Sequence, residues 1–217
     1  FTNIANLVGG TNTDSFVIEN SVDAVTGDAT IGNLTGSIDG GEDTGENTIT
    51  VANTSTRDFI FEVQDIDRSV VDVENTDRIF IDNINQLAAN TTNGQRNLLI
   101  ASNQTNEWEI NADDNTLNTM SFSGFDYLRG GNESDLFTFN GNTVAGLVDG
   151  GVNLVGVTDS VVINNVDNVS VQVDGLMDEI YAGNTNFNIA NVNSVTTNGT
   201  NQTLIGENFV STWAIDS

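Results

Sequence analysis

The acidic side chains and the missing residue types decide which chemistry this chain can perform. The 217 residues contain 31 Asp and Glu against five basic residues, and the formal net charge is −26. Cys and His are absent, which excludes thiol nucleophiles, disulfides, His-based triads and zinc sites of the usual ligand sets. A general nucleic-acid binder needs a basic surface, so the charge excludes that function as well.

Carboxylates acting in pairs could hydrolyse glycosidic bonds, but no spacing in the sequence singles out two of them. The chain also has no Lys, so the basic catalyst of a polysaccharide lyase would have to be Arg. We therefore expect no enzymatic activity. A polysaccharide-acting β-helix enzyme stays as an alternative.

One motif that combines two glycines with an aspartate occurs twice. The first occurrence has Gly9, Gly10, Asp14 and Phe16, and the second has Gly130, Gly131, Asp135 and Phe137. Each follows a Leu and leads into an apolar cluster. A tight turn in which one glycine takes a positive φ would explain the glycine pair.

The same pattern, Gly-Gly-x-x-x-Asp-x-Phe, resembles the nonapeptide of haemolysin-type calcium-binding repeats. The resemblance implies that turn carbonyls and the Asp carboxylates coordinate Ca²⁺, an ion that favours oxygen ligands. The positions carried over are Gly10, Asn12 and Asp14, and then Gly131, Glu133 and Asp135. Asn12 and Glu133 stand where the family has glycine, and no consecutive nonapeptide follows either motif.

The elements that position these motifs are predicted to be strands. Apolar residues come in short β-branched and aromatic clusters about every ten residues, separated by Asn, Asp, Gly and Thr. The run Val169–Val173 alternates apolar and polar residues, as a half-buried strand does. Strands are expected at 16–18, 49–51, 59–63, 70–73, 79–81, 161–163 and 169–173.

Self-comparison shows an internal repeat with landmarks in a conserved order. Besides the glycine motif, Gly36–Gly41 matches Gly146–Gly151, and the Trp-x-Ile pattern at Trp108 recurs at Trp213. The Asp-Gly-Gly sequence in the first of these matches, at Asp39 and Asp149, predicts a turn in which the aspartate accepts from a local backbone amide. We expect one repetitive β domain over residues 1–217, with a first copy at about 1–121 and a second, incomplete copy at about 122–217. The expected structural anchors are Trp108, Trp213, Gly9, Gly130, Phe16 and Phe137.

A β-solenoid, a parallel β-helix of about ten rungs, is the architecture that these features favour. Gly, Asn and Asp supply corners, β-branched residues supply stackable inward positions, and Pro, which would interrupt pairing between rungs, is absent. The alternative is two immunoglobulin-like β-sandwich repeats, because a period of about 105–121 residues is also the size of such a domain.

The order of the landmarks also looks like that of the long repeats of giant secreted bacterial proteins, the filamentous-haemagglutinin-like adhesins with degenerate haemolysin-type motifs. This resemblance implies an extracellular or cell-surface module that supplies length and rigidity. Its partners would be neighbouring repeats, other copies of itself, and a glycan or host-surface ligand. The alternative is a self-assembling subunit of an extracellular filament or surface layer. No membrane insertion is expected, since no run of about 18 apolar residues occurs.

Overall fold

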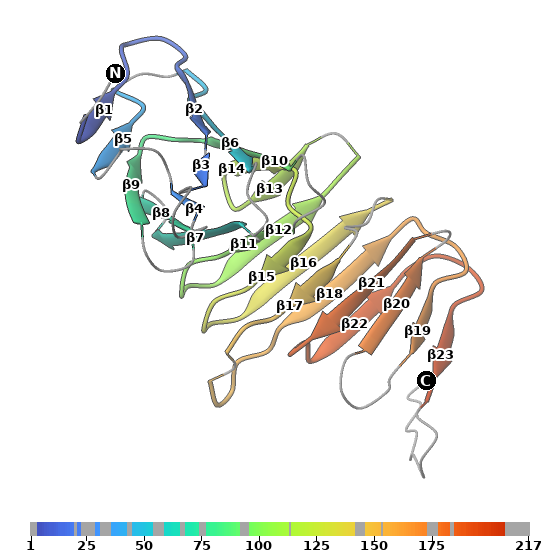
Figure 1. The fold of residues 1–217 in the computed structure, drawn as a ribbon. Coiled ribbons are helices and arrows are strands. Elements are labelled where there is room, and N and C mark those ends of the chain that lie inside the picture. The colour runs from blue at the N-terminus through green and yellow to red at the C-terminus, as the bar shows by residue number, and fades with distance from the viewer. Residues whose placement is uncertain are drawn as a thin grey trace.

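The computed structural model is all-β, and its strands form two long sheets (Figure 1). The described part of the chain contains no helix that could cross a membrane. The structure describes residues 4–19, 21–22, 29–30, 36–42, 45–53, 59–65, 68–73, 77–91, 96–112, 114–141, 146–152, 154–172, 178–182 and 185–206.

Twelve strands form the first sheet, called sheet A. In spatial order they are β1 (Asn6–Val8), β5 (Ser37–Asp39), β9 (Asp77–Asp82), β8 (Arg68–Val73), β7 (Phe59–Asp65), β11 (Asn97–Ile100), β15 (Tyr127–Arg129), β17 (Leu147–Asp149), β21 (Thr185–Ala190), β20 (Asp178–Ala182), β19 (Ser170–Gln172) and β23 (Thr203–Ile205).

Nine strands form sheet B. In spatial order they are β2 (Ser15–Glu19), β6 (Thr48–Asn53), β10 (Gln86–Thr91), β14 (Met120–Ser123), β13 (Asn115–Leu117), β12 (Asn106–Ile110), β16 (Asp135–Asn140), β18 (Ser160–Asn164) and β22 (Ser194–Thr197). A separate antiparallel pair joins β3 (Ser21–Val22) and β4 (Ala29–Thr30). All seven predicted strands are confirmed.

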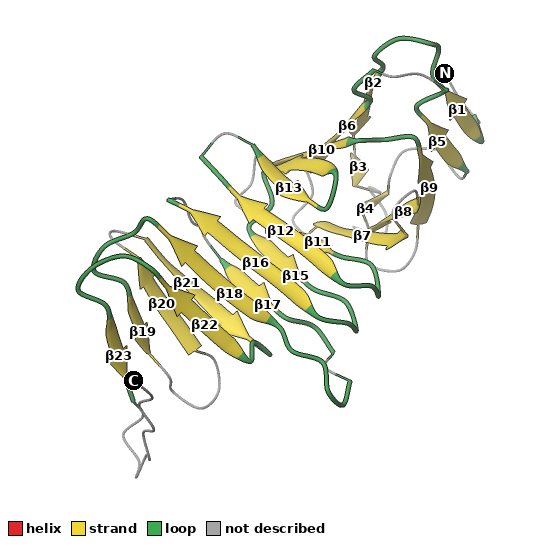
Figure 2. Ribbon diagram, turned by 180° about the vertical axis from the view of Figure 1, so that it is seen from behind, coloured by secondary structure: helices red, strands yellow, loops and turns green. Residues whose placement is uncertain are grey.

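Most neighbours within a sheet are parallel because the chain alternates between the two sheets. Strands β15, β16, β17 and β18 belong to sheets A, B, A and B in turn. Strand β15 then pairs in parallel with β17, and β16 pairs in parallel with β18. Figure 2 shows β16, β18 and β22 stacked in this way. Each return to a sheet therefore adds one strand beside the previous one.

Three antiparallel meanders, which the sequence analysis did not predict, interrupt this alternation. They are β7–β8–β9 in sheet A, β12–β13–β14 in sheet B and β19–β20–β21 in sheet A. Strands joined by short turns pair locally without crossing to the other sheet, so such hairpins form within a single layer. Each meander adds two extra strands to its own sheet.

The first two meanders lie in different sheets and add the same number of strands to each. Strands β5 and β6 are consecutive in the chain and lie in opposite sheets, as do β11 and β12. Three strands separate β5 from β11 in sheet A, and three separate β6 from β12 in sheet B. An insertion in one sheet is thus matched by an insertion in the other, and the two sheets advance by equal numbers of strands.

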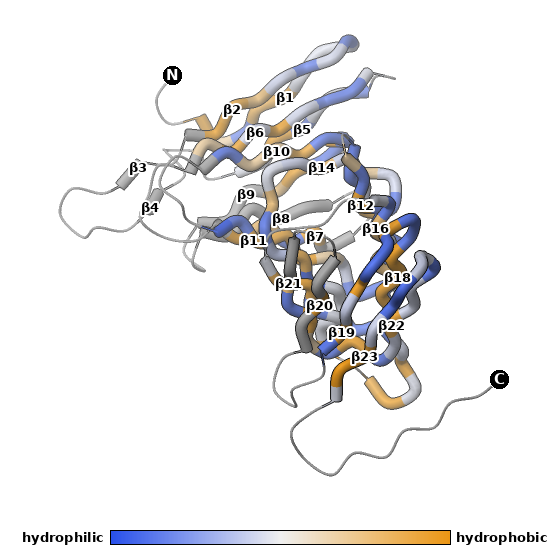
Figure 3. The backbone as a smooth tube through the Cα atoms, turned by 90° about the vertical axis from the view of Figure 1, so that its right-hand side faces the viewer, coloured by the Kyte–Doolittle hydropathy of each residue, from blue (hydrophilic) through white to orange (hydrophobic). Residues whose placement is uncertain are grey.

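One apolar core lies between the sheets and runs through both halves of the chain. Along β16 and β18, buried residues alternate with more exposed ones, and Figure 3 shows hydrophobic and hydrophilic residues in this part of the chain. The ring of Trp108 stacks on Phe137 at 5.3 Å, and Phe139 stacks on Phe187 at 4.8 Å. At the expected boundary between the repeats, β11 pairs in parallel with β15. Shared parallel sheets and a shared core differ from two separate sandwiches with antiparallel sheets.

Candidate functional site

The main polar constellation lies at the corners where the chain leaves sheet A and enters sheet B. Residues at the start of four neighbouring sheet B segments bond to one another in a column, called the Asp135 column, in which Asn106, Asp135 and Asp159 are buried and Asn193 is exposed. Asn106 Nδ2 donates to Asp135 Oδ1 at 2.6 Å. The backbone N–H of Asp135 donates to Asp159 Oδ1 at 2.8 Å, and that of Asp159 donates to Asn193 Oδ1 at 2.7 Å. The column therefore joins β12, β16, β18 and β22.

Asp135 is a buried acid whose pKa is strongly raised. Its side chain is 1% exposed, and Asp159 beside it is also buried. The pKa of Asp135 is raised to about 7, chiefly because the carboxyl group is buried and to a lesser extent because the Asp159 carboxylate is near, while hydrogen bonds from Asn106 and Gly131 oppose the rise. The buried pair makes protonation of this corner sensitive to pH near neutrality.

The first copy of the motif forms a similar but more open corner. Gly10 N–H donates to Asp14 Oδ2 at 2.7 Å, as Gly131 N–H donates to Asp135 Oδ2 at 2.9 Å. The backbone N–H of Asp14 donates to Asn47 Oδ1 at 2.9 Å. Asp14 is only half-buried. The structure thus gives both aspartates the same local role, as acceptors within their own turns.

The predicted positive φ falls on different glycines. It occurs at Gly41 and Gly151, with φ of 93° and 94°, and not in the glycine pairs of the motif. A Cβ on Gly131 would collide with the carbonyl oxygen of Ser102 on the preceding corner. The motif glycines at the second corner are therefore required by the close approach of stacked corners rather than by a left-handed backbone.

A second set of aspartates closes the turns that follow β5 and β17. Asp39 Oδ1 accepts from Gly41 N–H at 2.9 Å and from Asn83 Nδ2 at 2.8 Å. These bonds, that from Gly41 above all, lower the pKa of Asp39. Asp149 Oδ1 accepts from Gly151 N–H at 2.9 Å and from Asn191 Nδ2 at 2.7 Å. The sequence-based interpretation of both aspartates as turn residues is confirmed.

A ladder of asparagine side chains, which the sequence analysis did not predict, lies where the strands of sheet B end. Asn140 donates to Asn111, Asn164 donates to Asn140, and Asn198 donates to Asn164, through side-chain amides at 3.0, 2.9 and 2.6 Å. A sequence signal existed, because three of these residues directly follow the last inward apolar residue of a strand. The ladder links four segments along the stacking direction.

The carried-over calcium ligands do not form a recognisable ion site in the described residues. The carboxylates of Asp14 and Asp135 are engaged by turn N–H groups, while Asn12 is exposed and Glu133 is exposed. The described part of the chain has no group of three or more acidic side chains that could hold a metal. Calcium binding at Gly10 and Gly131 stays a prediction.

The structural anchors differ in their surroundings. Trp108 and Phe137 are 0% exposed, and Trp108 also makes an edge contact with Phe122 at 5.7 Å. Phe16, the counterpart of Phe137, is only half-buried. Trp213 lies outside the described residues. At the other two anchors, Gly9 and Gly130, a Cβ would collide with a carbonyl oxygen of the next corner, from Gly40 and Gly150 respectively.

Comparison of the sequence with models of known protein families and with curated proteins gives no match. The functional argument therefore depends on the geometry. The polar side chains described above bond mainly to the segment before or after them in the stack. Such an arrangement holds successive layers together.

Proposed function

We propose that the chain is a structural repeat module of a large extracellular bacterial adhesin or surface stalk, and that its role is mechanical rather than catalytic. In this proposal the two sheets form a β-solenoid of about ten rungs. The observation that supports it best is the direction of the hydrogen bonds. Ladders of parallel strands and the Asp135 column both run along the stacking axis, so pulling along this axis loads many hydrogen bonds together.

Each repeat would supply a fixed length. Six strand spacings separate β1 from β15 in sheet A, and strands lie about 4.8 Å apart, so a repeat of this kind extends a stalk by roughly 30 Å. The net charge of −26 would keep neighbouring stalks apart in solution. A glycan or host-surface ligand would bind elsewhere along the parent protein or on its neighbouring repeats.

Labelling of intact cells tests this proposal. Antibodies raised against the purified chain should bind intact cells of the source organism, with gold particles at a distance from the envelope in electron micrographs. Permeabilised cells provide the control for total protein. Labelling that appears only after permeabilisation would overturn the surface role.

A second candidate, a filament subunit, is favoured by the ends of sheet A. In the described residues its edge strands are β1 and β23, and the pairing pattern makes them run in the same direction. Val8 is 70% exposed and Leu204 is 56% exposed on these edges. Exposed edges pair with other chains. Sedimentation at increasing concentration should then show growing polymers, whereas a constant monomer would reject this candidate.

A further inference from the structure

Two asparagines at the ends of sheet B strands directly precede a glycine. Asn140 ends β16 and is followed by Gly141, whereas Asn198 comes directly after β22 and is followed by Gly199. The backbone nitrogen of a glycine is easily reached by the side chain before it, because glycine has no Cβ that would shield this nitrogen. Both asparagines belong to the asparagine ladder, whose members are Asn111, Asn140, Asn164 and Asn198.

The reaction available to such an Asn-Gly pair is deamidation. The backbone N–H of the glycine loses its proton to solvent, and the nitrogen attacks Cγ of the asparagine. A C–N bond forms, the side-chain nitrogen leaves as ammonia, and a five-membered succinimide results. Water then opens this ring at one of its two carbonyl groups, which gives aspartate or isoaspartate. The reaction consumes only water, so a protein can undergo it without an enzyme.

The asparagine ladder restrains the side chain that would react at Asn140. Attack requires Cγ of Asn140 to turn toward the nitrogen of Gly141, and the side-chain amide has to rotate for this. Nδ2 of Asn140 donates to Asn111 Oδ1 at 3.0 Å, and Oδ1 of Asn140 accepts from Asn164 Nδ2 at 2.9 Å. Rotation therefore breaks two hydrogen bonds to neighbouring segments, and each of them raises the barrier to the attack.

The peptide bond between Asn140 and Gly141 is accessible to solvent. Both residues are exposed. Gly141 has a φ of 75°, and a Cβ placed on it would meet no heavy atom of its described surroundings within 4 Å. Water and base can thus reach the reacting atoms, while the hydrogen bonds to Asn111 and Asn164 hold the amide back.

The second Asn-Gly pair lies in a turn that packs against the preceding corner. Asn198 Nδ2 donates to Asn164 Oδ1 at 2.6 Å, and Asn198 Oδ1 accepts from the backbone N–H of Asn165 at 3.0 Å. Gly199 is half-buried, and a Cβ on it would collide with the carbonyl oxygen of Val166. The glycine of this pair is therefore restrained as well as the asparagine.

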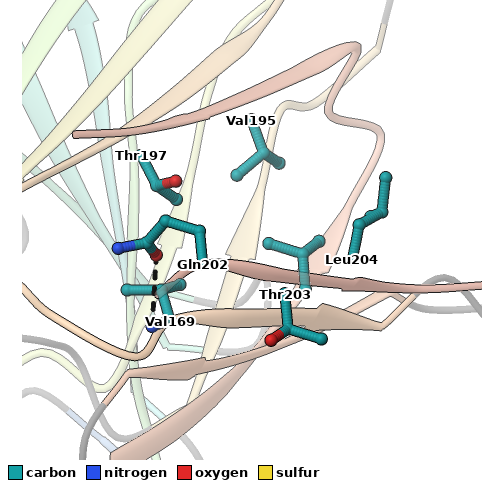
Figure 4. Close-up of a pocket in the computed structure, with 7 residues that line it drawn as sticks. Val169, Val195, Thr197, Gln202, Thr203 and Leu204 are labelled. Carbon is teal, nitrogen blue, oxygen red and sulfur yellow. Dashed lines mark hydrogen bonds between the residues drawn. The ribbon is translucent and has the colours of Figure 1, made fainter. Parts of the chain in front are cut away.

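The residues that follow this second pair bind the same corner. The backbone N–H and the hydroxyl of Thr200 both donate to Asp167 Oδ1 at 2.8 Å. Gln202 Oε1 accepts from the backbone N–H of Val169 at 3.1 Å (Figure 4), and Gln202 Nε2 donates to the carbonyl oxygen of Val166 at 3.2 Å. These four bonds hold the turn in one geometry, so the second pair is the better protected of the two.

We propose that Asn140 is a site of spontaneous covalent modification, at which the folded protein deamidates, and that the asparagine ladder controls the rate. The inference is independent of the proposed function. The carboxylate of the product can accept from Asn164 but cannot donate to Asn111, so the ladder loses the bond between the ends of β12 and β16. Isoaspartate would also lengthen the backbone at the end of β16. A chain that stays in use for long would therefore lose this contact with age.

Site-resolved mass spectrometry of the ageing chain tests the proposal. The purified protein is kept at neutral pH, in buffer and in urea, and the extent of conversion at each asparagine is followed by peptide mapping. We expect Asn140 to convert at least about tenfold more slowly in the folded chain than in urea, because two hydrogen bonds resist rotation of its amide. In the folded chain it should still convert faster than Asn198. The comparison uses the unmodified chain and needs no variant to fold.

Two variants of one ladder residue separate the ladder from general solvent exposure. Asn111→Ala removes the acceptor for Asn140 Nδ2, so conversion at Asn140 should rise about fivefold while conversion at Asn198 stays unchanged. Asn111→Asp is the matched control, because both variants lose the bond from Asn111 Nδ2 to the carbonyl oxygen of Asp114, but Asp keeps the oxygen that Asn140 needs. This control should leave the rate at Asn140 close to that of the unmodified chain.

A third variant acts on both pairs. Asn164→Ala removes one hydrogen bond from Asn140 and one from Asn198, so both should convert faster. Circular dichroism checks that each variant keeps its β structure. Equal conversion of Asn140 in buffer and in urea, or no acceleration in folded Asn111→Ala, would overturn control by the ladder. Faster conversion at Asn198 than at Asn140 in the folded chain would overturn the choice of site.

Discussion

The corners at Asp14 and Asp135 have the same motif and the same local hydrogen bond, yet their aspartates lie in different environments. Asp14 is half-buried, and Asp135 is 1% exposed. The difference follows from their strands, because β2 is the edge of the described sheet B and β16 lies between β12 and β18. The next corner also differs, since it carries Asn47 in the first case and Asp159 in the second. Stacking neighbours, rather than the motif, decide the chemistry of the corner.

Alanine at the second glycine of each motif should give the largest contrast. The Cβ of Gly131→Ala would collide with the Ser102 carbonyl oxygen, whereas Gly10→Ala has no heavy atom nearer than Asp14 Oδ2 at 4.0 Å. We expect Gly131→Ala to lower the free energy of unfolding by roughly 3 kcal/mol and Gly10→Ala by less than about 0.5 kcal/mol. Urea unfolding at pH 7 measures both. Equal losses would show that the two corners are stacked alike.

The pH dependence of stability should report the buried aspartate. Because the pKa of Asp135 rises from 3.8 to about 7 on folding, the folded state holds this proton more tightly than the unfolded state. The stabilisation of the folded state that follows from this raised pKa is fully present below about pH 4 and is lost as the pH rises to 7. We expect a decline of roughly 2–3 kcal/mol in this range, measured by urea unfolding, and a clearly smaller decline in Asp135→Asn.

Asp39→Asn is the control for this pH profile. The pKa of Asp39 is lowered by hydrogen bonds from Gly41 and Asn83. The ionised Asp39 therefore stabilises the folded state above about pH 4, and this stabilisation is lost below that pH. This variant should therefore leave the decline between pH 4 and 7 unchanged. A decline of the same size in Asp135→Asn and in the unmodified chain would contradict the assignment to Asp135.

Asp159→Asn should make the second corner resemble the first, in which Asn47 occupies this place. Asn retains the oxygen that accepts from the Asp135 N–H but removes a neighbouring negative charge. We expect the pKa of Asp135 to fall and the stability at pH 8 to rise by roughly 1 kcal/mol. Carboxyl NMR titration and urea unfolding measure the two effects. An unchanged Asp135 titration would show that burial alone raises its pKa.

Calcium should give the smallest effect. In the described residues the carboxylates of Asp14 and Asp135 already accept from N–H groups of their own turns, so a calcium ion would have to displace these bonds. We expect the Tm in millimolar Ca²⁺ and in EDTA to differ by less than about 1 °C. A rise of several degrees that disappears in Asp14→Asn would support the haemolysin-type interpretation of the first corner.

The strands and the turns could be predicted from the sequence because both depend on local chemistry. The alternation at Val169–Val173 and the cluster at Phe59–Val63 predicted β19 and β7. The Asp-Gly-Gly pattern predicted that Asp149 bonds a nearby backbone amide. The meanders could not be predicted in this way, because hairpins and crossovers use the same strand and turn residues. Their difference lies in which distant strand each segment meets.

The sequence by itself determined that this protein is built from short strands, that its side chains exclude thiol and histidine chemistry, and that the corners carry Gly, Asn and Asp. Only the tertiary structure decided that Asp135 is buried beside Asp159 while Asp14 stays half-exposed, and that Phe16 is half-buried where Phe137 is covered. The physical reason is that burial depends on the neighbouring layers, which come from segments that are distant in the chain.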